Sequence, residues 1–98
     1  MAEPYEVVNN RAASRFETER EGEMAVLEYK ETDSAIDLLH TAVPPALEGQ
    51  GAGGALALAA LQYAKAAGKQ VIPTCRFVRA YIARHPEWSA IVAPARTP

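Results

Sequence analysis

The chain of 98 residues has the length of one small domain, and 49% of its residues are hydrophobic while 22% are charged. Such proportions are typical of a globular protein with a buried core. The formal net charge of −2 at pH 7 gives no general attraction to nucleic acid or to an anionic membrane surface, so neither is expected as a partner.

The sequence also lacks the usual signals of secreted, membrane and metal-binding proteins. A single cysteine excludes an internal disulfide, no basic-then-apolar segment precedes Tyr5, and no apolar run approaches the length of a membrane span. The two histidines and the cysteine are widely separated, without H-x-x-x-H or C-x-x-C spacing, so no metal is expected. We therefore expect a cytoplasmic protein with one domain over residues 1–98.

The N-terminal half predicts an antiparallel meander of strands. A first β region covers residues 6–19 and is interrupted at Asn9–Asn10, because asparagine favours turns. A second strand, residues 23–31, alternates apolar and polar residues as a half-buried strand does. After a turn at residues 32–34, a third strand is expected over residues 35–43.

The third strand carries the first candidate for catalysis, His40. Strict alternation places His40 on one face with three apolar residues: Ile36, Leu38 and Ala42. It places four residues on the opposite face: Asp37, Leu39, Thr41 and Val43. A neutral imidazole at His40 is suited to take a proton from an attacking amine, and a core histidine with satisfied hydrogen bonds is the alternative.

The periodicity then changes to that of a helix. Apolar residues recur at helical spacing within residues 51–67, and almost no charge precedes Lys65, so this helix should be buried and central. A short apolar strand over residues 70–74 completes a β-α-β unit and should pair in parallel with the 35–43 strand. Pro73 and the pair Pro44–Pro45 lack ladder amides near one end of that pair, so the two strands should splay there.

A splay of this kind matters because it leaves backbone groups unpaired. An extended, amide-bearing ligand can bond to them as if it were another strand. A second helix is expected over residues 77–84, ending at Pro86, and Ile91–Val92 are expected to add a final strand. Cys75 lies just before this helix, where its thiol is either a nucleophile with a lowered pKa, a wall of the site or a buried small hydrophobe.

The most specific motif is the run V-P-P-A-L-E-G-Q-G-A-G-G at residues 43–54. Glycines at a helix start let the free first-turn amides approach an anion such as a diphosphate, although a turn that merely reverses the chain is the alternative. No G-x-x-x-x-G-K-[ST] is present, which argues against nucleotide hydrolysis. Gly49, Gly51 and Gly54 match G-x-G-x-x-G, but the acidic residue of a dinucleotide fold is missing about 20 residues further on.

Residues 48–53 are similar to the Q/R-x-x-G-x-G/A turn of coenzyme A binders. Together with V-P-P before it and C-R-F-V-R-A-Y-I-A-R-H-P-E-W at residues 75–88, the chain resembles the GNAT superfamily of acyl-CoA-dependent N-acetyltransferases from about residue 6 to residue 92, and in particular its small, short-chain members. The resemblance implies an α/β (α+β) fold. Its mixed, mostly antiparallel twisted sheet carries a central helix after the glycine-rich turn and a second helix after the fifth strand.

The resemblance also implies a ligand and a site. Acetyl-CoA would be the acyl donor, without a metal, and a primary amine of a protein, peptide or small molecule the acceptor. The pantetheine arm would lie along the third strand at Leu39, Thr41, Ala42 and Val43. The diphosphate would meet the amides of Gln50, Gly51, Ala52, Gly53 and Gly54.

Three other positions take a role from the resemblance. Tyr81 lies where many such enzymes have a tyrosine that protonates the coenzyme A thiolate, and a half-buried structural aromatic is the alternative. Glu48 replaces the usual Arg or Gln and is expected to point into solvent, away from the anion. Arg84 and two nearby arginines form a basic flank that either is solvated or contacts the adenosine 3′-phosphate.

Several alternatives stay open. Acyl transfer is either direct or through an acetylated Cys75, and a module that binds or senses acyl-CoA without turnover is the main alternative to an enzyme. A third possibility is a domain that acts through protein contacts alone. Neither the acceptor nor the oligomeric state follows from the sequence, and a second copy of the chain, in a homodimer, is one candidate for a missing wall of the acceptor site.

Overall fold

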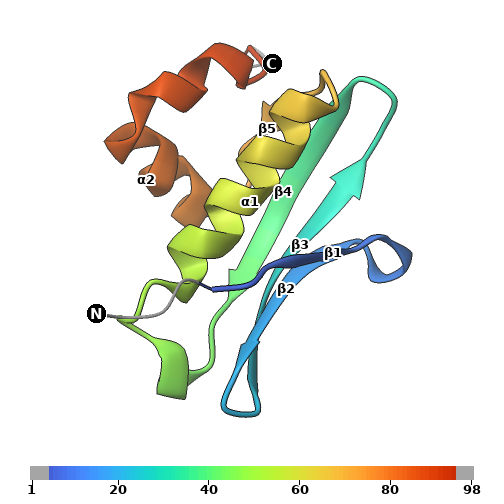
Figure 1. Ribbon diagram of the computed structural model, residues 1–98. Coiled ribbons are helices and arrows are strands. Elements are labelled where there is room, and N and C mark those ends of the chain that lie inside the picture. Colours follow the sequence, from blue (N-terminus) through green and yellow to red (C-terminus); the bar gives the residue numbers. More distant parts are fainter. Residues whose placement is uncertain (1–4, 95–98) are drawn as a thin grey trace.

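The computed structural model describes residues 5–94. Five strands form one sheet in the order β1-β2-β3-β4-β5, and two helices, α1 and α2, follow β4 and β5 (Figure 1). The strands are β1 (Val8–Asn10), β2 (Arg15–Arg20), β3 (Glu23–Glu31), β4 (Ala35–Ala42) and β5 (Gln70–Ile72). The helices are α1 (Ala52–Ala66) and α2 (Arg76–Arg84), with 3-10 turns η1 (Arg11–Ala13), η2 (Pro45–Leu47) and η3 (Pro86–Ile91).

The predicted fold class is confirmed. Neighbouring strands from β1 to β4 pair antiparallel, and β4 pairs with β5 in parallel across the α1 crossover. The predicted interruption of the first β region is η1, where the Asn10 side chain accepts a hydrogen bond from the Ala13 amide at 3.2 Å. The predicted strand over residues 23–31 is β3.

The core lies between the sheet and α1, which crosses in front of the strands in Figure 1. Leu56 and Leu61 of the helix are completely buried against Leu27 and Leu38 of the sheet. The inner face of the sheet contributes seven buried hydrophobic residues: Phe16, Ala25, Leu27, Tyr29, Ile36, Leu38 and Val71. Side chains of the outer face, such as Met24, are exposed, so the described helices cover one face only.

A β-bulge at Leu39 corrects the predicted faces of β4. Glu28 pairs with His40 but the next residue of β3, Tyr29, pairs with Leu38, so Leu39 is an extra residue in β4. The alternation therefore shifts by one position beyond Leu38. His40 lies on the outer face rather than beside Leu38, and Thr41 moves to the inner face opposite the buried Leu27.

The end of the chain also differs from expectation. β5 stops at Ile72, and the Thr74 amide donates to the Ile72 carbonyl at 3.0 Å instead of continuing the ladder. Ile91 and Val92 do not form a strand: Ile91 ends η3, and Val92 makes one isolated parallel bridge to Val71. No helix within residues 5–94 is long and apolar enough to cross a membrane.

A cluster around Glu31 ties the C-terminal end of α1 to the sheet. The Glu31 carboxylate accepts a hydrogen bond from the Tyr63 hydroxyl at 2.6 Å and lies 2.7 Å from the Lys69 ammonium. The Lys69 and Tyr63 hydrogen bonds lower the pKa of Glu31, although partial burial acts against them. A lowered folded-state pKa means that Glu31 stabilises the fold above its unfolded-state pKa and loses this effect as the pH falls through the folded value.

We predict that Glu31→Gln lowers the free energy of unfolding by about 1 kcal/mol at neutral pH. The difference from the unmodified protein should be smaller at an acidic pH, where the carboxylate of Glu31 is increasingly protonated. Urea denaturation at both pH values measures it, and Glu28→Gln on the exposed face of β3 is the matched control. An equal loss of stability at both pH values would contradict the assigned role of the charge.

Candidate functional site

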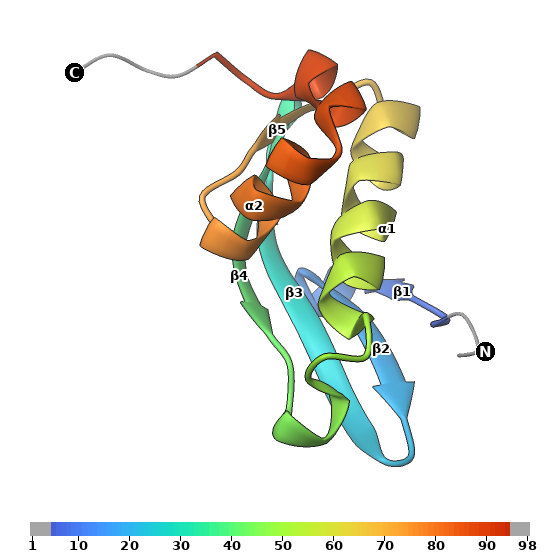
Figure 2. The ribbon, with the colours of Figure 1, turned by 90° about the vertical axis from the view of Figure 1, so that its left-hand side faces the viewer.

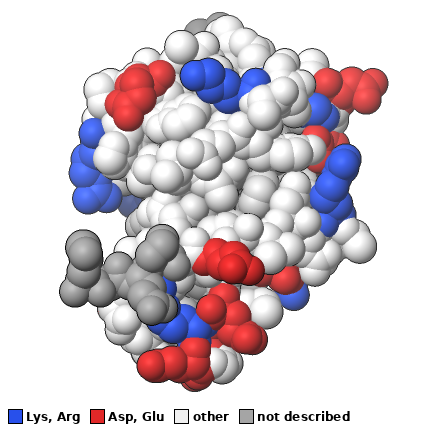
Figure 3. All heavy atoms as spheres, viewed as in Figure 1, with Lys and Arg blue, Asp and Glu red and all other residues white. Residues whose placement is uncertain are grey.

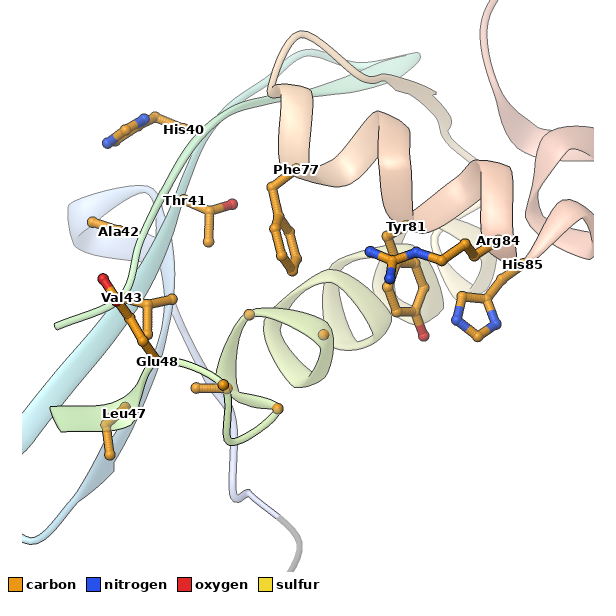
Figure 4. A pocket seen from close by; sticks show the side chains of 15 residues that line it. His40, Thr41, Ala42, Val43, Leu47, Glu48, Phe77, Tyr81, Arg84 and His85 are labelled. Carbon is orange, nitrogen blue, oxygen red and sulfur yellow. The ribbon is translucent and has the colours of Figure 1, made fainter. Parts of the chain in front are cut away.

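A cavity of about 850 Å³ opens between the end of β4, the glycine turn and α2 (Figure 4). Its walls are the C-terminal part of β4, the segment from Leu47 to the first turn of α1, and one side of α2. This volume falls within the range of roughly 300–1,000 Å³ for small-molecule sites. The predicted strand, turn and second helix therefore meet at one place.

The β4 side of the cavity has an open strand edge. Pairing with β5 ends at Asp37 and Ile72, and the Cys75 amide donates the last hydrogen bond on that side, to the Leu38 carbonyl at 2.8 Å. No described strand pairs with that edge of β4 beyond Leu38. Figure 2 shows β5 beside only the first part of β4, with α2 next to the rest. The predicted splay is thus present.

The bulge determines which side chains of this edge face the cavity. Thr41 and Val43 point toward the cavity and α1, whereas the His40 ring extends away on the other side of the strand (Figure 4). Leu39, the bulged residue, is 40% exposed and does not line the cavity. The predicted strand residues that line the cavity are His40, Thr41, Ala42 and Val43.

The glycine turn has the backbone geometry that an anion site needs. Gly49 and Gly51 have φ values of 75° and 89°, which only glycine adopts without strain. Gly51 is the N-cap of α1, and the amides of residues 51–54 donate no hydrogen bond to a described backbone group. These amides form the positive end of the helix. Gly51, Ala52, Gly53 and Gly54 all line the cavity.

Gln50 departs from the prediction. Its amide donates to the Leu47 carbonyl at 3.3 Å, and its side chain donates to the Ala46 carbonyl at 2.8 Å. Gln50 does not line this cavity. Because the Gln50 amide is hydrogen-bonded to the last residue of the 3-10 turn η2, it is not available to a ligand.

Glu48 is exposed, as expected, but it also lines the cavity. Its side chain extends toward Val43 on β4 (Figure 4). The carboxylate therefore lies at the β4 side of the opening, where its charge faces the path of a ligand along the strand.

Phe77 is the cavity residue that the sequence did not single out. Its ring rests on α1 so closely that a β-carbon at Gly53 would lie 2.7 Å from the ring tip. The ring is 38% exposed and stands between the β4 side chains and Tyr81 (Figure 4). The available signal was the spacing of Phe77, Tyr81 and Arg84 on one side of the second helix, distinct from the buried Val78 and Ile82.

Cys75 is the N-cap of α2 and does not line the cavity. The thiol is 7% exposed and lies 3.3 Å from the Thr41 hydroxyl. Burial acts to raise its pKa, but hydrogen bonds from Thr41 and from the amides of Val78 and Phe77 outweigh burial, so the pKa of Cys75 is lowered. These hydrogen bonds stabilise the thiolate form of Cys75, but its burial restricts the access of a ligand to the sulfur atom.

Tyr81 lies further along α2. Its ring contacts the Gly54 position and stacks on the His85 ring, with centroids 4.2 Å apart. Burial, and then the Glu87 charge, raise the pKa of the Tyr81 phenol, so the hydroxyl stays protonated at neutral pH. Its role as acid for the thiolate stays a prediction, and Phe77 separates it from Thr41.

The charges around the site are unevenly distributed. The helical face shown in Figure 3 is largely uncharged at its centre, and acidic residues gather toward its lower end, where the β2–β3 turn lies. Among residues 5–94, no group of three His, Cys, Asp or Glu side chains is arranged to hold a metal ion. The cavity thus offers the amides of residues 51–54 and the Arg84 guanidinium to an anionic ligand.

A comparison with protein families agrees with this geometry. The family model described as GCN5-related N-acetyl-transferase matches residues 15–91. The matched stretch begins at the first residue of β2, ends at the last residue of η3 and includes every residue that lines the cavity. The chain therefore belongs to the GCN5-related N-acetyltransferase family.

Proposed function

We propose that the protein transfers the acetyl group of acetyl-CoA directly to a primary amine. Family membership supports acyl transfer in general. The observation that carries the finer proposal is one cavity bounded by both the free amides of the glycine turn and the unpaired edge of β4. These two features match the two parts of coenzyme A that need backbone partners, the diphosphate and the amide-bearing pantetheine.

The residues present fit such a ligand. The amides of residues 51–54 would bind the diphosphate at the start of α1. The open edge of β4 at Thr41–Val43 would bind the pantetheine amides as an added strand. The diphosphate site differs from the sequence expectation in that it excludes Gln50, whose amide is already bonded.

The proposed chemistry forms a nitrogen–carbon bond as the carbon–sulfur bond of the thioester breaks. Backbone amides near Val43 would polarise the thioester carbonyl. The amine must lose a proton, and His40 serves as its base only if the amine approaches from the outer face of β4, where the imidazole lies. Water takes that proton otherwise, and Tyr81 or water returns one to the thiolate.

A binding module without turnover is the alternative, and the placement of the catalytic candidates favours it. The His40 ring lies on the outer side of β4 although the residue lines the cavity, Cys75 lies outside the lining, and Phe77 separates Tyr81 from Thr41. Both proposals require coenzyme A binding. Only the enzyme releases free thiol in proportion to added acceptor.

We expect coenzyme A to raise the melting temperature, because a ligand that binds only the native state stabilises it. With acetyl-CoA and a panel of primary amines and peptides, thiol release should depend on the acceptor and be measurable with a thiol reagent. A melting shift without thiol release for any acceptor would exclude the enzyme and support the binding module. The absence of a shift at millimolar coenzyme A would exclude both.

The glycine turn can be tested with two matched substitutions. Gly51 and Gly22 both have positive φ, 89° and 80°, and a β-carbon at either would meet no atom within 4 Å. Each change to alanine should therefore cost about 1 kcal/mol of stability through backbone strain alone. Only Gly51→Ala should weaken coenzyme A binding, by about tenfold or more, in calorimetric titration. Equal affinity of the two variants would argue against the turn as the anion site.

Direct transfer makes a further prediction about the single cysteine. Because the Cys75 thiol is buried and outside the cavity lining, incubation with acetyl-CoA should leave no acetyl adduct in the intact mass. Cys75→Ala should keep acceptor-dependent turnover. An adduct that hydroxylamine removes and that Cys75→Ala lacks would instead establish a covalent route.

A further inference from the structure

The cavity extends in two directions from the glycine turn. On one side lie Thr41 and Val43 of β4, and on the other lie Tyr81, Arg84 and His85 of α2. Figure 4 shows the first turn of α1 between these two groups of side chains. A ligand whose anionic centre rests on the turn therefore has room for one arm on each side.

Coenzyme A has this two-armed shape. Its pantetheine chain leaves one end of the diphosphate, and its 3′-phosphoadenosine leaves the other. If the pantetheine lies along β4, as the proposed function requires, the adenosine must extend toward the C-terminal turn of α2. The strand edge thus fixes which arm reaches α2.

The side chains of this second arm suit a phosphorylated nucleoside. The Tyr81 and His85 rings lie 4.2 Å apart and are inclined by 31°, so they present an aromatic surface to a base. The Arg84 side chain runs back beside Tyr81 at the cavity wall (Figure 4). A guanidinium binds a phosphate through two parallel hydrogen bonds, which makes arginine well suited to a terminal phosphate group.

Arg84 is also distinct from the other arginines of α2. It lines the cavity, whereas Arg76 and Arg79 do not. Within the described residues, Arg84 takes part in none of the ion pairs or side-chain hydrogen bonds found elsewhere in the structure, and the Glu87 carboxylate near this end of α2 does not line the cavity. The nearest carboxylate in the cavity lining, Glu48, lies on the opposite arm beside Val43.

We infer that Arg84 binds the 3′-phosphate of coenzyme A and makes the protein prefer coenzyme A to dephospho-coenzyme A. The site is open to solvent, so the preference is modest. Loss of the 3′-phosphate should weaken binding by about threefold to tenfold. The preference should also decrease as salt is raised, because the contact is an exposed ion pair.

Isothermal titration of the protein with coenzyme A and with dephospho-coenzyme A tests this assignment. Arg84→Gln should bind the two ligands with equal affinity, and its affinity for dephospho-coenzyme A should match that of the unmodified protein. Arg79→Gln removes the same charge from an exposed position outside the cavity, and it should keep the full preference. The melting temperatures of both unliganded variants provide the check on folding.

Each other outcome has a definite meaning. Equal affinity of the unmodified protein for both ligands would overturn the role of Arg84 while leaving the proposed function intact. A preference that persists in Arg84→Gln would place the 3′-phosphate elsewhere. Loss of the preference in Arg79→Gln as well would show that the preference depends on the total positive charge of α2 and not on Arg84. Failure of both ligands to bind would overturn the proposed function together with this inference.

Discussion

The extra residue at Leu39 is the constraint on which the site depends. It shifts the alternation of β4 by one position, so that Thr41 and Val43 follow Leu38 on the inner face and His40 is turned out. At the same level, the Cys75 amide bonds the Leu38 carbonyl and closes the parallel pairing with β5. Beyond that bond, β4 has a free edge next to the start of α1. A regular strand would keep the free edge, since β5 ends at Ile72, but it would turn Thr41 outward.

The cavity is held together by close packing between the two helices. Phe77 can rest on α1 only because residue 53 is a glycine, whereas a β-carbon at Gly54 would make an ordinary contact of 3.7 Å with the Tyr81 ring. Gly53 therefore has a packing role in addition to its free amide. Because Phe77 lies between the β4 side and Tyr81, this packing also divides the cavity into a β4 side and an α2 side.

The polar groups differ in how directly they can act on a substrate. The backbone amides of the glycine turn and the β4 edge are fixed by secondary structure and need no rearrangement to bind a ligand. The Cys75 thiol has a lowered pKa but is buried, and the His40 ring is accessible but faces outward. Binding and orientation of an activated donor are thus better supported by this chain than acid or base catalysis is.

The sequence by itself determined the elements and their order, because hydrophobic periodicity, turn residues and the glycine run are local signals. It also located the glycine turn at the start of α1, since positive φ at Gly49 and Gly51 is a property of glycine, and it predicted that pairing between β4 and β5 would end early. Only the tertiary structure decided which side chains face the cavity. Alternation cannot reveal a bulge, so His40 was placed on the wrong face, and the bonded Gln50 amide and the packing of Phe77 on Gly53 depend on contacts between distant segments.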